Sequence, residues 1–216
     1  VIDWHSIEDR TRELTRNSHW DGPEDIIQAA ASSFAIDKWV GQDYRVEVWV
    51  EKDALEGVIA KPCKELDISY FSCRGYTSQT SMWDAAMRMK EYSEDGKKVL
   101  VLHLGDHDPS GKDMSRDIED RIMLFTEHEC DIEIRRIALN MNQIEQYSPP
   151  PNPAKITDSR AKAYIEEYGD ESWELDALEP KVISQLITDH VLSVRDEDAW
   201  DEAVEEQREG RQLLDL

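Results

Sequence analysis

The sequence is poor in cysteine, and it lacks long apolar runs and phosphate-binding glycine motifs. Its three cysteines, Cys63, Cys73 and Cys130, form no CxxC pair, so neither a disulfide framework nor a zinc site is indicated. No apolar stretch reaches the ~20 residues that a membrane helix needs, and no secretory signal pattern is present. GxGxxG and Walker patterns are also missing. We therefore expect a cytoplasmic protein that is not bound to a membrane.

Basic residues are scarce relative to acidic ones. Lys and Arg total 25 against 48 Asp and Glu, which gives a formal net charge of −23. Proteins that bind nucleic acid usually carry a basic surface that releases counterions from phosphates, and this balance does not indicate one. A strongly solvated surface would explain the charge. Carboxylates that hold divalent cations, which reverse the local charge, are a compatible second explanation.

Strand-like and helix-like segments alternate along the middle of the chain. Runs rich in β-branched and aromatic residues predict strands, and apolar residues at helical spacing predict helices between them. The expected strands are 45–50, 68–71, 98–104 and 132–138, and the expected helices are 53–66, 78–92 and 112–125. This alternation predicts an α/β fold with a four-stranded parallel sheet flanked by helices.

The two ends of the chain are expected to add helices to this core. We expect an N-terminal helical extension over 1–43, a core over 44–140, and a proline-rich loop with acidic helices over 141–216. Four prolines between 147 and 153 predict the extended loop. Interrupted helical spacing over 7–35, and helical patterns at 158–168, 181–192 and 196–212, predict the added helices.

Acidic residues follow two of the four expected strands. Glu51 ends the first strand, and Asp106 and Asp108 follow the third. Functional groups of open α/β sheets gather beyond the carboxyl ends of the strands, and alternate residues of an extended chain share one side. The three carboxylates are therefore expected to converge, and their oxygens suit Mg²⁺, with Mn²⁺ as an alternative. Taken alone, Asp108 could equally cap the following helix.

Residues 106–117 also resemble the calcium loop of an EF-hand. Asp106, Asp108, Ser110 and Gly111 stand at the loop spacing, and Asp117 replaces the terminal glutamate. An EF-hand needs a helix before this loop, whereas 98–104 has the pattern of a strand. We therefore favour the magnesium site at the edge of a sheet.

A strand ending in glutamate, followed by a strand ending in Asp-x-Asp, resembles the Toprim fold of topoisomerases, bacterial primases and overcoming-lysogenization-defect nucleases. Gly75-Tyr76 before Asp106-His107-Asp108-Pro109-Ser110-Gly111 resembles more closely the A subunit of topoisomerase VI and its meiotic double-strand-break relatives. This likeness covers about residues 44–140. The segments 151–158 and 173–178 resemble the tail of uncharacterised Toprim proteins of phages and bacteria.

The resemblance implies metal-assisted chemistry at nucleic-acid phosphodiesters, with DNA as the favoured substrate. Glu51 would be a general acid/base or a ligand, and Asp106 and Asp108 would hold Mg²⁺. Further candidates are Glu174 and Asp176 for a second metal, and Lys52, Arg74 and Lys112 for substrate phosphates. Residues of these five kinds are more often ordinary charged surface residues, and that interpretation stays open for each of them.

The chain departs from the topoisomerases at their nucleophilic tyrosine, which lies in a domain before the Toprim core. Here the first tyrosine is Tyr44, inside the expected first strand, and Tyr76 suits packing or substrate contact. The resemblance therefore implies a DNA nuclease, or the cleavage-site half of a topoisomerase VI-like enzyme. In the second case a partner subunit or an upstream domain of a longer protein would carry the tyrosine.

Two other functions remain open. A non-catalytic, metal-binding interaction module that needs a partner is favoured by the net charge of −23, since an acidic surface repels DNA. Nucleotidyl transfer of the primase type would need zinc and helical modules that this chain lacks. A homodimer and an origin in a phage or mobile element are further expectations.

Overall fold

The computed structural model describes residues 17, 19–155 and 157–214. The chain divides into two compact units. The larger unit comprises residues 37–204, and the smaller combines residues of the segments 1–36 and 205–216. The candidate site lies in the larger unit, so the fold of that unit decides how the site is built.

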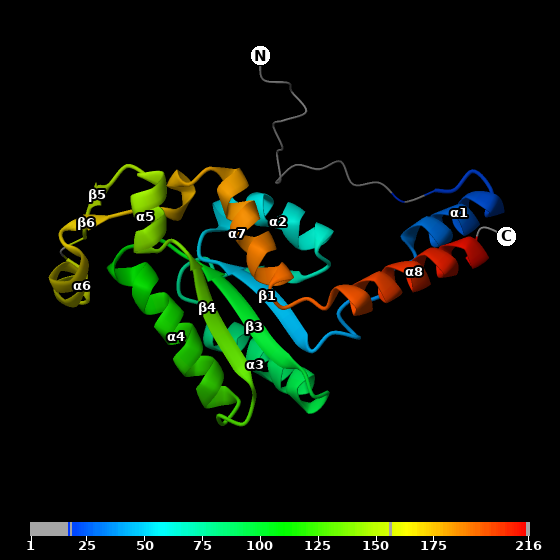
Figure 1. Ribbon diagram of the computed structural model, residues 1–216, viewed down its shortest axis with the longest axis horizontal. Coiled ribbons are helices and arrows are strands. Elements are labelled where there is room, and N and C mark those ends of the chain that lie inside the picture. Colours follow the sequence, from blue (N-terminus) through cyan, green and yellow to red (C-terminus); the bar gives the residue numbers. More distant parts are fainter. Residues whose placement is uncertain (1–16, 18, 156, 215–216) are drawn as a thin grey trace, which may run out of the picture. The chain divides into compact units, whose positions relative to one another are not determined.

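A four-stranded sheet forms the centre of the larger unit (Figure 1). Its strands are β1 (Tyr44–Val50), β2 (Ser69–Ser72), β3 (Lys98–Leu104) and β4 (Ile132–Ala138), in the order β2-β1-β3-β4. All three pairings are parallel. Buried apolar residues run almost continuously along β3, as is typical of parallel strands that are covered on both faces. The predicted parallel α/β sheet is confirmed.

Helices cover both faces of this sheet. Alternate residues of β1 point to opposite sides, so Val48 packs with α2 (Glu56–Glu65) and α7 (Pro180–Leu192) in one apolar core. Trp49 packs with α3 (Gln79–Glu94) and α4 (Pro109–Phe125) in a second core. Helix α4 begins at Pro109, three residues earlier than expected, because Asp108 caps its N-terminus.

The segment after β4 is more structured than expected. It contains α5 (Met141–Tyr147), a helix that the sequence analysis did not anticipate, and α6 (Ala161–Tyr168). The proline-rich segment includes β5 (Asn152–Pro153), which pairs antiparallel with β6 (Glu171–Ser172). The segment is therefore not only a loop, because its two-residue strand finds a partner later in the chain.

The smaller unit contains α1 (Pro23–Ser33) and the second half of α8 (Glu197–Leu214). Arg211 in α8 donates a hydrogen bond to the carbonyl of Phe34, with 2.8 Å between Nε and the oxygen. The part of the expected N-terminal helix over 7–16 lies outside the described residues. Among the helices that are described, none combines the length and the apolar character needed to cross a bilayer.

Candidate active site

Glu51 and Asp106 meet at the carboxyl edge of the sheet. The N–H of Glu51 donates to the carbonyl of Leu104 at 2.9 Å, which extends the pairing of β1 with β3 by one residue. The N–H of Asp106 donates to Oε2 of Glu51 at 2.9 Å. Parallel neighbouring strands therefore bring these two sequence-predicted residues into direct contact.

Two glycines make room for the Glu51 carboxylate. A Cβ on Gly105 would lie 2.8 Å from Oε2 of Glu51, and a Cβ on Gly111 would lie 3.0 Å from the same oxygen. The Gly111 Cβ would also overlap the carbonyl oxygen of Asp106. Larger residues at either position would close the space that this carboxylate occupies.

Asp108 is the N-cap of α4. Its Oδ1 accepts hydrogen bonds from the N–H of Gly111 at 2.6 Å and from the hydroxyl of Ser110 at 2.9 Å. The capping role is therefore present in this structure. The EF-hand alternative is excluded, because strand β3 stands where an EF-hand requires a helix.

Lys52 gathers three carboxylates, of which Asp106 is one. Its Nζ lies 3.3 Å from Oδ2 of Asp106, 2.6 Å from Oε2 of Glu174 and 3.1 Å from Oδ1 of Asp176. The other Asp106 oxygen, Oδ1, accepts from the N–H of Leu175 at 2.8 Å. The structure thus brings Glu174 and Asp176 to the site, and it places the expected phosphate-binding lysine among acids.

His107 explains how residues 174–176 reach the site. Its main chain exchanges two hydrogen bonds with Trp173, at 2.8 and 2.9 Å. Its ring is fully buried, and Nδ1 lies 2.7 Å from the hydroxyl of Tyr164. Burial lowers the pKa of His107 to about 4, so the ring is neutral at physiological pH. His107 therefore anchors residues 106–108, which we call the acid loop, to the later segment that contains Trp173.

Glu51 and Asp106 hold their protons more strongly than isolated carboxyl groups do, because the pKa of each is raised. Burial, followed by repulsion from Asp106 and Asp108, raises the pKa of Glu51 to about 7, although the Asp106 N–H opposes this. Burial also raises the pKa of Asp106, despite the Leu175 N–H and Lys52. For Lys52, burial lowers the pKa, but Glu174, Asp106 and Asp176 outweigh it and hold the pKa above its ordinary value. A carboxyl group with a pKa near neutrality can both take up and release a proton.

Arg136, at the end of β4, was not singled out by the sequence analysis. Its guanidinium donates to the carbonyls of Gly105 at 2.8 Å, Asp106 at 2.6 Å and Gly111 at 3.0 Å. Burial lowers the pKa of Arg136 to about 10, against the attraction of the nearby acids. The sequence signal was present, since a pair of arginines interrupts the apolar strand 132–138.

The two other predicted substrate cations lie away from this cluster of contacts. The side chain of Arg74 is 72% exposed and pairs with Asp53 at 3.0 Å. Nζ of Lys112 lies 5.2 Å from the centre of the Tyr168 ring. Among the contacts of the described residues, neither charged side chain touches Glu51, Asp106 or Asp108, although the main-chain N–H of Lys112 donates to the Asp108 carbonyl at 3.1 Å.

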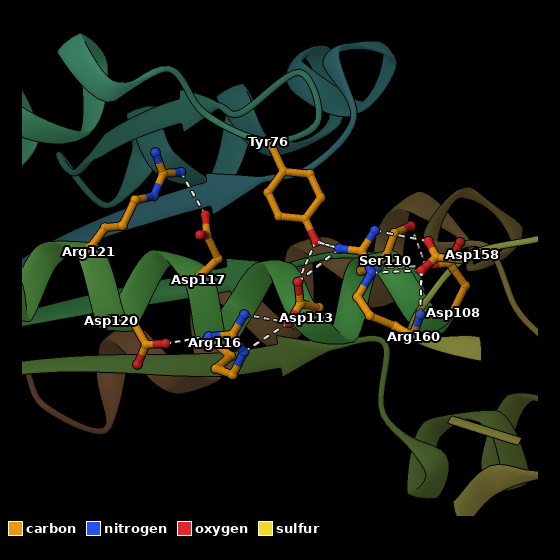
Figure 2. Close-up of polar contacts among 11 residues, drawn as sticks. Tyr76, Asp108, Ser110, Asp113, Arg116, Asp117, Asp120, Arg121, Asp158 and Arg160 are labelled. Carbon is orange, nitrogen blue, oxygen red and sulfur yellow. Dashed lines mark hydrogen bonds and ion pairs between the residues drawn. The ribbon is translucent and has the colours of Figure 1, made fainter. Parts of the chain in front are cut away.

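A second polar network lies next to the N-terminus of α4 (Figure 2). The Tyr76 hydroxyl donates to Oδ2 of Asp113 at 2.6 Å, and Arg160 contacts both Tyr76 and Asp113. Arg160 also pairs with Asp158 at 2.7 Å. Tyr76, from the Gly-Tyr motif, is therefore held against the helix that Asp108 caps.

The acids are suitable ligands for a hard cation, but they do not surround one as they stand. Within the described ranges, no three His, Cys, Asp or Glu side chains form a group that could hold a metal ion. The donors are nevertheless all carboxylates, which Mg²⁺ prefers, and Gly105 and Gly111 leave room for the Glu51 carboxylate. Metal binding would therefore require Asp106 or Asp108 to turn from its present partners.

Comparisons with protein-family models, curated proteins and solved structures give no match to this chain. Its function must be inferred from the site.

Proposed function

We propose that this chain is a Mg²⁺-dependent Toprim-type protein that acts on nucleic-acid phosphodiesters, with DNA as the favoured substrate. It would be a nuclease, or the cleavage-site half of a topoisomerase VI-like enzyme. The observation that carries this proposal is the contact between Glu51 and Asp106 beyond neighbouring parallel strands, with Asp108 two residues further on. Convergent, mutually repelling carboxylates destabilise a fold, so a role in chemistry accounts for them better than a role in packing.

The residues of the site have distinct roles in this proposal. Asp106 and Asp108 would hold Mg²⁺, which supplies positive charge to a phosphate and its attacking and leaving oxygens when it is bound. Glu51, whose pKa is raised to about 7, would hold or move the proton of the attacking or leaving oxygen. Arg136 fixes the main chain of Asp106 and Gly111, and therefore positions the carboxylates.

The nucleophile distinguishes the two forms of the enzyme. A nuclease would use water, and then this chain could act alone. A topoisomerase-like enzyme would need a tyrosine from a partner subunit or another domain. Tyr76 is bound to Asp113 and Arg160, and we assign it a role in substrate contact.

A non-catalytic, metal-binding Toprim module that needs a partner is the second candidate. The net charge of −23 favours it, and so do the ion pairs around the site. Lys52, Arg74 and Arg160 are each paired with acids, which reduces their attraction for phosphates. In this case the acidic surface would face a protein partner, and the partner would carry out the chemistry.

A metal titration separates these functions. Mg²⁺ or Mn²⁺ is added to the wild type and to a Glu51→Gln/Asp106→Asn double variant, and melting temperature and plasmid cleavage are measured together. The control is Asp201→Asn/Glu202→Gln, two exposed acids of α8, because it changes the net charge by the same amount.

If the chain is an enzyme, the metal should both stabilise it and support cleavage. Both effects should be lost in the double variant and retained in the control. Stabilisation without cleavage would favour the interaction module. An unchanged melting temperature and no cleavage in the wild type at any metal concentration would contradict both candidates.

A further inference from the structure

A pocket of about 540 Å³ lies beyond the carboxyl end of the edge strand β2. Its lining includes Tyr70, Ser72, Arg74, Tyr76, Thr77 and Ser78, and we refer to it as the β2 pocket. Pockets that bind small organic groups have volumes in this range. The pocket is therefore large enough for one nucleotide, and it is distinct from the carboxylates described above.

The β2 pocket adjoins the end of β1 that carries Glu51. The N–H of Cys73 donates to the carbonyl of Val50 at 2.8 Å, and the N–H of Gly75 donates to the carbonyl of Glu51 at 3.2 Å. The main chain that forms the wall of the pocket is thus hydrogen-bonded to the residue of the proposed general acid/base. The paired β-strands β1 and β2 lie only ~4.8 Å apart. A nucleic-acid strand that places a phosphodiester over Glu51 would therefore reach the β2 pocket with a neighbouring nucleotide.

Two exposed aromatic rings line the β2 pocket. Tyr70 is 40% exposed and Tyr76 is 43% exposed. The hydroxyl of Tyr76 is bound to Asp113, and the guanidinium of Arg160 lies 5.3 Å from the centre of its ring (Figure 2). These contacts fix the orientation of that ring before any ligand arrives. Exposed aromatic rings next to a phosphodiester site are the usual stacking surfaces for nucleobases.

Polar groups without partners line the same pocket. Among the described residues, the hydroxyls of Ser72 and Thr77 have no hydrogen-bond partner, although Thr77 is only 6% exposed. The neighbouring thiol of Cys73 is at most a weak acceptor for Thr77. Buried hydroxyls are normally hydrogen-bonded, but these two oxygens are shielded from solvent, so a sugar hydroxyl or a base edge would meet them only if the side chains turned toward the pocket. The exposed guanidinium of Arg74 is available to a phosphate at the cost of its contact with Asp53.

We propose that the β2 pocket binds one unpaired nucleotide of the strand on which the carboxylate site acts, so that the preferred substrate is single-stranded or locally unpaired. This inference rests on the proposed function. A base inside a duplex has both faces covered by its neighbours, and only an unpaired or flipped nucleotide can present a face to Tyr70 or Tyr76. Stacking also suits a chain with a net charge of −23, which gains little from counterion release.

Binding without metal tests the pocket separately from catalysis. In EDTA, fluorescence anisotropy would measure the affinity for an end-labelled oligothymidylate of about ten nucleotides, and for a hairpin duplex with the same label. The variants are Tyr70→Ala, which removes an exposed ring of the pocket, and Tyr70→Phe, which keeps the ring. Tyr147→Ala is the control, because this residue of α5 is similarly exposed at 41% and does not line the pocket.

The wild type, Tyr70→Phe and Tyr147→Ala should bind the single strand with similar affinity and more tightly than the hairpin. Tyr70→Ala should bind it roughly 10-fold more weakly, as expected for one lost stacking contact. The ratio of the two affinities should depend little on salt concentration. Equal affinities of the wild type and Tyr70→Ala, tighter binding of the hairpin, or no binding at all would overturn the proposal that the β2 pocket binds an unpaired nucleotide.

Mg²⁺-dependent cleavage of the same strands is then measured in parallel. If Tyr70→Ala still cleaved the single strand and bound it with unchanged affinity, the nucleotide-binding role of the β2 pocket would be overturned, and the proposed function would stand. Ring-dependent binding without cleavage under any metal would support the pocket and contradict the enzyme.

Discussion

The guanidinium of Arg136 donates a 2.6 Å hydrogen bond to the carbonyl of Asp106, and so ties the end of β4 to the acid that follows β3. The same side chain donates to Gly105 and Gly111 on either side of the acid loop. One cation thus satisfies carbonyl groups at both ends of the loop. Its positive charge also lies close to Glu51, Asp106 and Asp108, which attract it.

Replacing Arg136 by Met is expected to destabilise the protein by about 3 kcal/mol, because several carbonyls lose a charged donor. Any metal-dependent activity should fall with it, since the acid loop loses its anchor. Arg136→Lys should lose less stability than Arg136→Met, but it cannot reproduce the forked contacts of a guanidinium. Urea denaturation and the plasmid assay would measure the two effects.

Arg135→Met is the matched control for that experiment. Arg135 is the adjacent residue, and its ion pair among the described residues is with Glu133 of the same strand; about a third of its side chain is exposed. Such pairs contribute roughly 0–1 kcal/mol. Equal losses of stability at the two positions would contradict the role assigned to Arg136.

Gly111→Ala tests the cradle around the Glu51 carboxylate. The new methyl group would overlap the carbonyl of Asp106 and approach Glu51 Oε2 to 3.0 Å, so a loss of about 1–3 kcal/mol is expected. The metal-induced rise in melting temperature should shrink at the same time. Gly41→Ala is the control, because its methyl group would meet only Ala199 at an ordinary 3.8 Å; thermal melts of both variants with and without Mg²⁺ decide the matter.

The raised pKa of Glu51 predicts how stability depends on pH without metal. The unfolded carboxyl releases its proton near the ordinary glutamate pKa of 4.5, whereas burial raises the pKa of the folded one to about 7. Stability should therefore fall as pH rises through this window, by up to about 3 kcal/mol, and change little above it. Glu51→Gln does not titrate and keeps an acceptor for the Asp106 N–H, so it should lack this loss.

Urea unfolding in EDTA at several pH values would compare the wild type with Glu51→Gln. The difference in unfolding free energy between them should grow in favour of the variant from acid to neutral pH. A constant difference across the window would show that the Glu51 carboxyl is not perturbed.

The strands of the fold were predictable because their signals are local. β3 and β4 were predicted to the residue, since β3 is a nearly continuous run of β-branched and other apolar residues, and the three isoleucines of β4 recur around its charged residues. The convergence of Glu51 with Asp106 follows from parallel pairing alone. By contrast, the short α5 follows directly on β4 in a polar stretch, Met141–Tyr147, where no strong apolar periodicity marks a helix.

The environment of Lys52 could not be predicted, because it depends on contacts between distant parts of the chain. Glu174 and Asp176 reach Lys52 only because Trp173 pairs with the main chain of His107. Nothing near residue 52 in the sequence indicates this return. The expected role of Lys52, contact with substrate phosphates, was inferred from its sequence neighbours alone. That inference could not include the three carboxylates that contact Lys52 in the fold.

Lys52→Met should reveal how strongly the site attracts a cation. Removing Nζ leaves Asp106, Glu174 and Asp176 close together without a counter-charge, so the metal-free protein should lose about 1–2 kcal/mol through carboxylate repulsion. Added Mg²⁺ should restore that loss, and the metal-induced rise in melting temperature should exceed that of the wild type. Lys38→Met is the control, because Lys38 pairs with the single carboxylate of Asp67 at 3.2 Å, and its metal response should match that of the wild type. If Lys52→Met responded to Mg²⁺ no more than Lys38→Met, these carboxylates would not be a cation site, and Asp108 with Glu51 would have to supply the metal ligands alone.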